Sequence, residues 1–152
     1  MNPHKGFTLI EVLIVMGIIS ILAAIVIIAI NPARQFAQAR DTQRISNVNA
    51  IINAIGQRMV DNKGVFEGTF TVGAATYTCG PIPTAATTIA WAMAADITTA
   101  TGNLGCLIPT YLPQGLNEPK TGAGAYTLEM VNGRVVVAAP GAEITIPILV
   151  TR

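Results

Sequence analysis

The chain has 152 residues, which is enough for one domain of ordinary size or a small domain with an appendage. Charged residues make up 11% of it and the formal net charge is +1, so it offers no strong field for holding nucleic acid or anionic lipid. Hydrophobic residues reach 51%. These values exclude a disordered tail, a histone-like DNA binder and a disulfide-rich miniprotein.

The apolar residues are concentrated near the N-terminus. Residues 7–30 read FTLIEVLIVMGIISILAAIVIIAI, and Glu11 is the only ionisable side chain among these 24. As a helix this run would span about 36 Å, more than the hydrocarbon core of a bilayer at about 30 Å. A plain membrane anchor is one alternative. A signal peptide fits less well, because the run exceeds the usual apolar region and Asn31-Pro32 is a poor exit for cleavage.

The head of this run carries a specific motif. Residues 5–11 read KGFTLIE, with Gly, Phe and Glu at fixed spacing. This segment resembles the processing site of type IV pilins and of the pseudopilins of type II secretion. The resemblance implies that a membrane-embedded prepilin peptidase cuts between Gly6 and Phe7 on the cytoplasmic side. It further implies that the new amine of Phe7 is methylated and that residues 7–30 become the packing core of a filament.

Glu11 needs a partner, because a lone carboxylate inside an apolar membrane helix is costly. The resemblance supplies one, since cleavage gives Phe7 a cationic amine four residues before Glu11. The pair can neutralise each other within one subunit, and in the filament Glu11 meets the Phe7 amine of a neighbour. A misaligned subunit would leave a carboxylate unpaired in hydrocarbon, so the pair would set the register of assembly. We therefore expect Glu11 to be an assembly residue.

A second helical pattern follows the apolar run. Pro32 would kink or melt a continuing helix, so Asn31-Pro32 is the expected site of bending, with Gly17 as another soft point. Beyond it the sequence predicts an amphipathic helix that ends near Gly64, a left-handed cap. The predicted apolar stripe is Phe36, Ile45, Val48, Ile51, Ile52, Ile55 and Met59. The predicted polar face is Arg40, Gln43, Asn47, Asn53 and Gln57.

The remaining residues predict short strands and loops. The threonine-rich segment 69–101 indicates extended structure, and we expect a short helix around Trp91 within residues 85–97. Asn132-Gly133 is the preferred two-residue turn of a hairpin that joins strands 126–131 and 134–139. This turn pairs Val131 with Arg134 and stacks three apolar pairs on one face: Met130/Val135, Leu128/Val137 and Tyr126/Ala139.

A third strand is expected at an edge of this sheet. Ile144, Ile146, Ile148 and Val150 alternate along it, and Pro147 argues for an edge position. The predicted fold is therefore α+β, pilin-like: a long N-terminal helix, half transmembrane and half amphipathic, packed on a small antiparallel β-sheet head. We expect a leader at 1–6, a transmembrane and filament-core helix at 7–30, its amphipathic continuation at 31–63, and the head at 64–152.

Cys79 and Cys106 are the only cysteines. The resemblance and the implied topology place the head outside the cytoplasm, where a disulfide persists. Such a bridge would contribute about 3–4 kcal/mol in the chain-entropy model. Two unpaired buried thiols are the alternative. A metal pair is disfavoured, because His4 is the only histidine and lies in the leader.

The sequence shows no catalytic constellation. A chain cleaved after Gly6 has no histidine for a nucleophile–base pair, and the carboxylates Asp96, Glu118, Glu129 and Glu143 are scattered. We expect no enzyme, no cofactor and no metal. Major secretion pseudopilins often bind calcium in a loop before the last strands, but residues 112–119 offer only Asn117 and Glu118 as side-chain ligands.

The sequence thus predicts a structural subunit of a type IV pilus or pilus-like filament. The implied partners are further copies of the chain, prepilin peptidase, an inner-membrane platform protein, an assembly ATPase, and membrane lipid before assembly. The head would lie outside the cytoplasmic membrane and then on a surface or periplasmic filament. The alternatives are a type II secretion pseudopilin, a minor pilin whose head binds DNA or a surface, and a plain anchored domain. The balanced charge gives no strong nucleic-acid signal.

Overall fold

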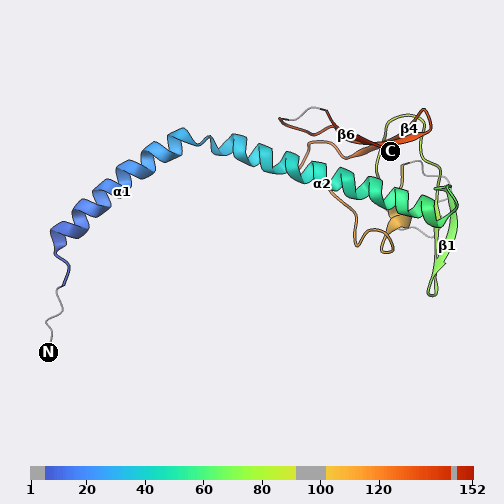
Figure 1. Cartoon of the computed structure of the whole chain (residues 1–152), viewed down its shortest axis with the longest axis horizontal. Helices are drawn as coiled ribbons and strands as arrows, with labels where there is room; N and C mark the ends of the chain where they lie inside the picture. Colours follow the sequence, from blue (N-terminus) through green and yellow to red (C-terminus); the bar gives the residue numbers. More distant parts are fainter. Residues whose placement is uncertain (1–5, 92–101, 145–146) are drawn as a thin grey trace. The chain divides into compact units, whose positions relative to one another are not determined.

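The computed structural model describes residues 6–91, 102–144 and 147–152. Two helices, α1 (Leu9–Ala29) and α2 (Pro32–Asp61), are followed by short strands and loops (Figure 1). The chain divides into two compact units, one ending at Phe36 and the other running from Ala37 to Arg152. The fold is the α+β, pilin-like architecture that the sequence predicts: the helical region has an apolar first half, and α2 packs on small antiparallel sheets.

Helix α1 is apolar on every side. Its residues are mostly Ile, Leu, Val, Ala and Met, and none of them is buried. Among the residues that the structure describes, it is the one helix long and apolar enough to cross a membrane. A helix that is hydrophobic all round needs an apolar environment, either protein or lipid.

The helical region is interrupted where the sequence predicts bending. Ile30 has an extended backbone, with φ −98° and ψ 108°. The side chain of Asn31 accepts a hydrogen bond from the Arg34 N–H at 3.2 Å, as a helix N-cap does, and Pro32 is the first residue of α2. Proline suits this position because its missing N–H would have no partner in the first helical turn. The interruption therefore follows from Asn31-Pro32.

The core of the second unit forms around α2. Val48, Ile51, Ile52 and Ile55 are each at most 2% exposed and join the buried cluster with residues of the sheet. Two members of the predicted stripe do not. Phe36 and Ile45 are 65% and 42% exposed. The stripe continues by spacing toward the N-terminus, but the sheet covers only the later turns, so the prediction for these two was wrong.

Helix α2 ends as expected near Gly64. The Gly64 N–H donates to the Met59 carbonyl at 2.7 Å, and Gly64 has φ +93°. Lys63, the residue before it, also adopts a positive φ of 56°. Two successive left-handed residues turn the chain away from the helix axis and close its last turn.

A four-stranded antiparallel sheet contributes buried residues to the core around α2. Its order is β3 (Thr87–Thr88), β4 (Thr127–Val131), β5 (Arg134–Ala139) and β6 (Ile148–Thr151). The β4–β5 register is the predicted one at Val131/Arg134, Met130/Val135 and Leu128/Val137. Asn132 and Gly133 both have positive φ, as this turn requires. Tyr126 and Ala139 are buried but lie beyond the β4–β5 ladder, which ends at Thr127/Ala138.

The third predicted strand is shorter than expected. Strand β6 covers only Ile148–Thr151, at the edge of the sheet that Pro147 predicts. Ile144 lies outside the strand and is 40% exposed, while Ile146 falls outside the described residues. The predicted helix at 85–97 is absent from its described part, because residues 87–88 form β3; residues 92–97 lie outside the described range.

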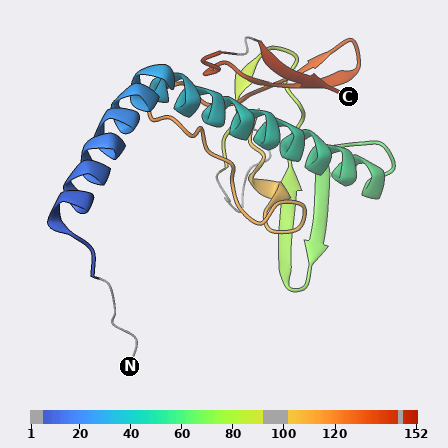
Figure 2. The same ribbon diagram turned by 60° about the vertical axis from the view of Figure 1, so that its left-hand side comes forward.

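A separate hairpin, β1 (Gly68–Val72) and β2 (Ala75–Cys79), lies beside the last turns of α2 (Figure 2). Phe70 and Tyr77 stack with ring centroids 5.4 Å apart, and the buried Arg58 of α2 places its guanidinium 4.4 Å from the Phe70 ring. The structure joins Cys79 at the end of β2 to Cys106 in the short 3₁₀ helix Gly105–Leu107, with Cα atoms 5.4 Å apart. The bridge fixes the hairpin to the loop that follows.

The disulfide gives a stability prediction. Replacing both Cys79 and Cys106 by serine should lower the free energy of unfolding by about 3 kcal/mol, because the unfolded chain regains the freedom of a closed loop. Urea denaturation of the full chain in detergent micelles measures this. An unchanged midpoint, or two free thiols in the native protein under non-reducing conditions, would contradict it.

Candidate functional site

The predicted cleavage point lies in exposed chain ahead of α1. Gly6 and Phe7 are outside the helix, and the Phe7 side chain is 88% exposed. A Cβ placed on Gly6 would meet nothing within 4 Å. The peptide bond between them is therefore presented in a non-helical segment, which is the backbone form that a peptidase can bind and cleave.

Glu11 and Thr8 close the start of α1 together. The Thr8 N–H and hydroxyl both donate to Glu11 Oε2, at 2.9 and 2.8 Å. The Glu11 N–H donates in return to Thr8 Oγ1 at 3.3 Å. This reciprocal arrangement is a capping box, and it satisfies backbone groups that the first helical turn leaves without partners.

Sequence reasoning gave Glu11 a partner in Phe7 and overlooked Thr8. The structure places the Glu11 carboxylate against Thr8, and the Phe7 nitrogen is part of a peptide bond. The signal was present in the sequence, since Thr followed three residues later by Glu at the head of an apolar run is the pattern of a capping box. Glu11 thus has a local role in addition to any role between subunits.

A comparison with known protein families matches the same N-terminal segment. Residues 1–30 match the family model described as the prokaryotic N-terminal methylation motif. The chain is prepilin-like. The motif is characteristic of type IV pilins and type II secretion pseudopilins, and it implies processing by prepilin peptidase and assembly machinery. No curated protein and no solved structure was found to match the chain.

The head of this prepilin-like chain contains an ion network that sequence reasoning missed. Arg44 of α2 is fully buried and donates through Nε to Glu118 Oε1 at 2.7 Å and through Nη1 to Asp41 Oδ1 at 2.6 Å. Nη1 also contacts Glu143 Oε1 at 3.2 Å. Glu118 and Glu143 were expected to be scattered, and the fold instead brings both to Arg44.

Glu143 is held by three cations. Besides Arg44, Arg40 makes a two-pronged contact with it at 2.7 and 2.8 Å, and Lys120 donates to Glu143 Oε2 at 3.0 Å. The backbone N–H groups of Glu143 and Ile144 donate to the Asp41 carboxylate, at 3.0 and 2.7 Å for the closest contacts. The network therefore joins residues 40–44 of α2 to the loop before β4 and to the loop after β5.

The charges in this network stabilise one another. The hydrogen bond from Arg40, then those from Lys120 and Arg44, hold the pKa of Glu143 well below its usual range, although burial acts in the opposite direction. Burial alone would lower the pKa of Arg44, but its bonds to Glu118, Asp41 and Glu143 raise that pKa further above its already high value. These shifts keep Glu143 and Arg44 charged at neutral pH, so their contact is an ion pair and not a site that takes up or releases a proton.

The other predicted site residues do not gather into a catalytic or metal-binding cluster. Glu129 lies on β4, away from the loops of the network, and Asp96 falls outside the described residues. In the loop weighed for calcium, Glu118 is taken by Arg44, and the Asn117 carbonyl accepts from the Asn47 side chain at 3.4 Å. Within the described ranges, no group of three or more His, Cys, Asp or Glu side chains could hold a metal ion.

Arg44 should be essential to the stability of the head. Changing Arg44→Ala removes the shared cation and leaves buried carboxylates unpaired, so the free energy of unfolding should fall by about 3–5 kcal/mol. The exposed Arg134 is the matched control, and Arg134→Ala should change it by at most about 0.5 kcal/mol. Urea denaturation of the full chain in micelles measures both, and equal effects would contradict the role of the network.

The low pKa of Glu143 predicts a pH dependence. Because the folded state lowers this pKa, Glu143 contributes stability above the pKa of the unfolded chain, near 4.5, and that contribution is lost as the pH falls further. Glu143→Gln should therefore be less stable than the parent chain at pH 7, and the difference should shrink between about pH 5 and pH 2. Urea midpoints across this range test it; a difference that does not vary with pH would contradict it.

Proposed function

We propose that the chain is a structural subunit of a type IV pilus or pilus-like filament, processed after Gly6 and polymerised through its apolar helix. One observation carries the proposal: none of the 21 residues of α1 is buried, although the helix is apolar on all sides. The described part of the chain gives α1 no cover of its own. Membrane lipid covers it before assembly, and the α1 helices of neighbouring copies cover it afterwards.

The proposed mechanism transfers α1 from the bilayer to the filament core. Lipid tails are as apolar as the side chains of α1, so burial among other helices gains packing but little hydrophobic free energy. Assembly therefore requires an external source of work, which the prepilin machinery of an ATPase and an inner-membrane platform protein would supply. Specific contacts between subunits must then set the axial position of each new subunit in the filament.

Glu11 is the proposed register contact. After cleavage between Gly6 and Phe7, the amine of Phe7 is free and becomes methylated, and Glu11 of an incoming subunit pairs with this amine on a neighbour. A subunit out of register would bury an unpaired carboxylate among apolar side chains, which costs several kcal/mol. The capping box places this carboxylate at the start of α1, four residues after Phe7, and the proposed role depends on its charge.

A pilus-type filament is favoured over the major secretion pseudopilin. The loop of residues 112–119 has Glu118 as its only acidic side chain, and Arg44 binds that carboxylate. A calcium ion takes six to eight oxygen ligands, and this loop offers few. The head then lies outside the cytoplasmic membrane, first as an anchored domain and then on the filament surface.

Processing is tested by the intact mass of the membrane-extracted protein. In cells with an active prepilin peptidase, the mass should correspond to a chain that starts at Phe7 and carries one added methyl group. Gly6→Leu should leave the leader in place, because a side chain next to the cut bond obstructs the peptidase. A parent chain that retains Met1 in such cells would refute the proposal.

Two variants test the assembly role of Glu11: one removes its charge, and the other removes its hydrogen bond with the Thr8 side chain. Glu11→Gln keeps a side-chain oxygen that can accept from Thr8 but removes the charge, so filament formation should be lost while membrane insertion is retained. Thr8→Ala removes the cap and keeps the charge, so filaments should still form. Sheared filament yield and membrane content measure the two effects. Normal yield from Glu11→Gln would remove Glu11 from its proposed role.

A further inference from the structure

The β1–β2 hairpin is built only from uncharged residues. Residues 68–80 read GTFTVGAATYTCG, with no charged side chain and no proline. Proteins normally protect an exposed edge strand with lysine, proline or a bulge, because its unpaired main-chain groups bind other strands. The four-stranded sheet follows this rule, since β3 is two residues long and Pro147 immediately precedes β6. The hairpin carries no such protection and is therefore open to pairing with another strand.

The outer edge of β1 presents a regular row of main-chain groups. The two strands pair residue for residue, without a bulge, from Val72/Ala75 beside the turn to the base of the hairpin. The pair beside a two-residue turn is hydrogen-bonded, and bonded and non-bonded pairs then alternate along the ladder. Thr69 and Thr71 thus direct their N–H and C=O groups away from β2. In the described part of the chain, these groups have no backbone partner.

Strand β1 forms the open side of the hairpin. The far end of β2 is joined through Cys79 and Cys106 to the 3₁₀ helix at Gly105–Leu107, whereas β1 lies on the other side of the hairpin (Figure 2). Both threonines of β1 are exposed. The edge available to a partner strand is therefore that of β1.

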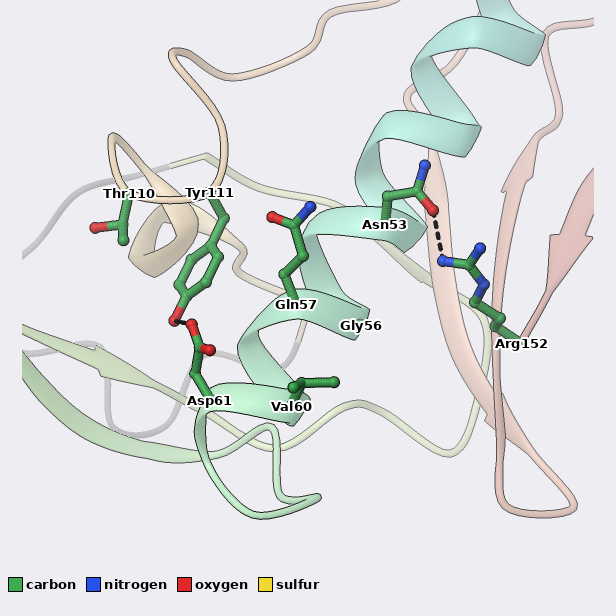
Figure 3. A pocket seen from close by; sticks show the side chains of 8 residues that line it. All are labelled: Asn53, Gly56, Gln57, Val60, Asp61, Thr110, Tyr111 and Arg152. Carbon is green, nitrogen blue, oxygen red and sulfur yellow. Dashed lines mark hydrogen bonds between the residues drawn. The ribbon is translucent and has the colours of Figure 1, made fainter.

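Contacts with α2 hold the hairpin in place. Phe70 meets the Tyr111 ring edge-on, with centroids 6.0 Å apart, and Tyr111 Oη donates to Asp61 of α2 at 2.9 Å (Figure 3). Arg58, whose guanidinium lies over Phe70, also donates to the Gly68 carbonyl at 3.2 Å. An isolated two-stranded hairpin is marginally stable in water, but these contacts fix this one to the helix. The β1 edge is thus already ordered, which lowers the cost of pairing.

The edge of β1 is complementary to a second copy of itself. Its central residues, Thr69-Phe70-Thr71, read the same in either direction. When two such edges pair antiparallel about Phe70, Thr69 of each copy faces Thr71 of the other, and the outward N–H and C=O groups of both are satisfied. The threonines then share one face of the joined sheet and the phenylalanines the other. No like charges meet, because the hairpin has none.

We propose that two copies of the chain pair edge to edge through β1, with Thr69 opposite Thr71. This inference rests on the proposed filament function and concerns contacts between different filaments. A surface that pairs with its own copy about a two-fold axis closes on itself, so this contact cannot extend a helical polymer. It instead joins a subunit of one filament to a subunit of another. Each contact is small, but many along two filaments act together and hold them side by side.

Charge exchange at the edge tests this pairing. One full chain carries Thr69→Lys with Thr71→Lys, and another carries Thr69→Glu with Thr71→Glu. Filaments of either chain alone should associate at least about tenfold less than parental filaments, because every proposed pair then opposes like charges. Mixing the two kinds of filament should restore association, because each lysine then faces a glutamate. Low-speed sedimentation of sheared filaments measures association.

The matched control places the same charge on the same face of the hairpin but on the other strand. Thr76→Lys with Thr78→Lys should leave association near the parental level, because β2 is not the proposed edge. Four results would overturn the inference and leave the proposed function intact: parental filaments that stay separate, β1 variants that associate as the parent does, mixtures that remain dispersed, or an equal loss in the control.

Cross-linking tests the register directly. Filaments of Thr69→Cys are mixed with filaments of Thr71→Cys and mildly oxidised. Covalent dimers that contain one chain of each kind should form at least about tenfold more than dimers within either kind alone, because only the mixed pair brings the two Cα atoms within reach of a disulfide. Equal amounts of mixed and unmixed dimers would contradict the proposed register. If the parent chain forms no filaments at all, the proposed function itself fails, and the inference fails with it.

Discussion

Helix α1 sets the terms for the rest of the molecule, because it is apolar all round and the described part of the chain leaves it uncovered. An uncovered apolar helix is stable only in lipid or among other apolar helices. The other described elements adjoin this helix or fold separately from it. The Thr8–Glu11 capping box completes the start of this helix, and Gly6 and Phe7 precede it in exposed, non-helical chain.

The ion network attaches two loops of the head to α2. The four-stranded sheet and α2 share an apolar core, but apolar contacts alone do not fix where two loops far apart in the sequence attach to the helix. Arg44 does so through directional bonds to Glu118 and Glu143. The same bonds draw Arg40, Asp41 and Arg44 inward, so the exposed residues of α2 between Gln38 and Val60 are uncharged, whereas Arg34 and Asp61 near its two ends are exposed.

Local sequence patterns predicted much of this structure, whereas contacts between residues far apart in the chain were not predicted. The Asn132-Gly133 turn fixed the β4–β5 register, and Asn31-Pro32 located the end of α1, because each acts on neighbouring backbone alone. Partners of Arg44 that are 74 and 99 residues away could not be read from spacing. Periodicity also predicted burial for Phe36, since it reports which residues share a helix face but not how far the covering sheet extends.

The interruption at Ile30–Asn31 has a mechanical consequence. Each helix is terminated by its own bonds there, as the Ile30 N–H still reaches Val26 while Asn31 begins the ladder of α2. Changing the backbone angles of these two residues therefore breaks few hydrogen bonds. In the proposed filament, this joint is the place where the helical region can change direction while both helices keep their own hydrogen bonds.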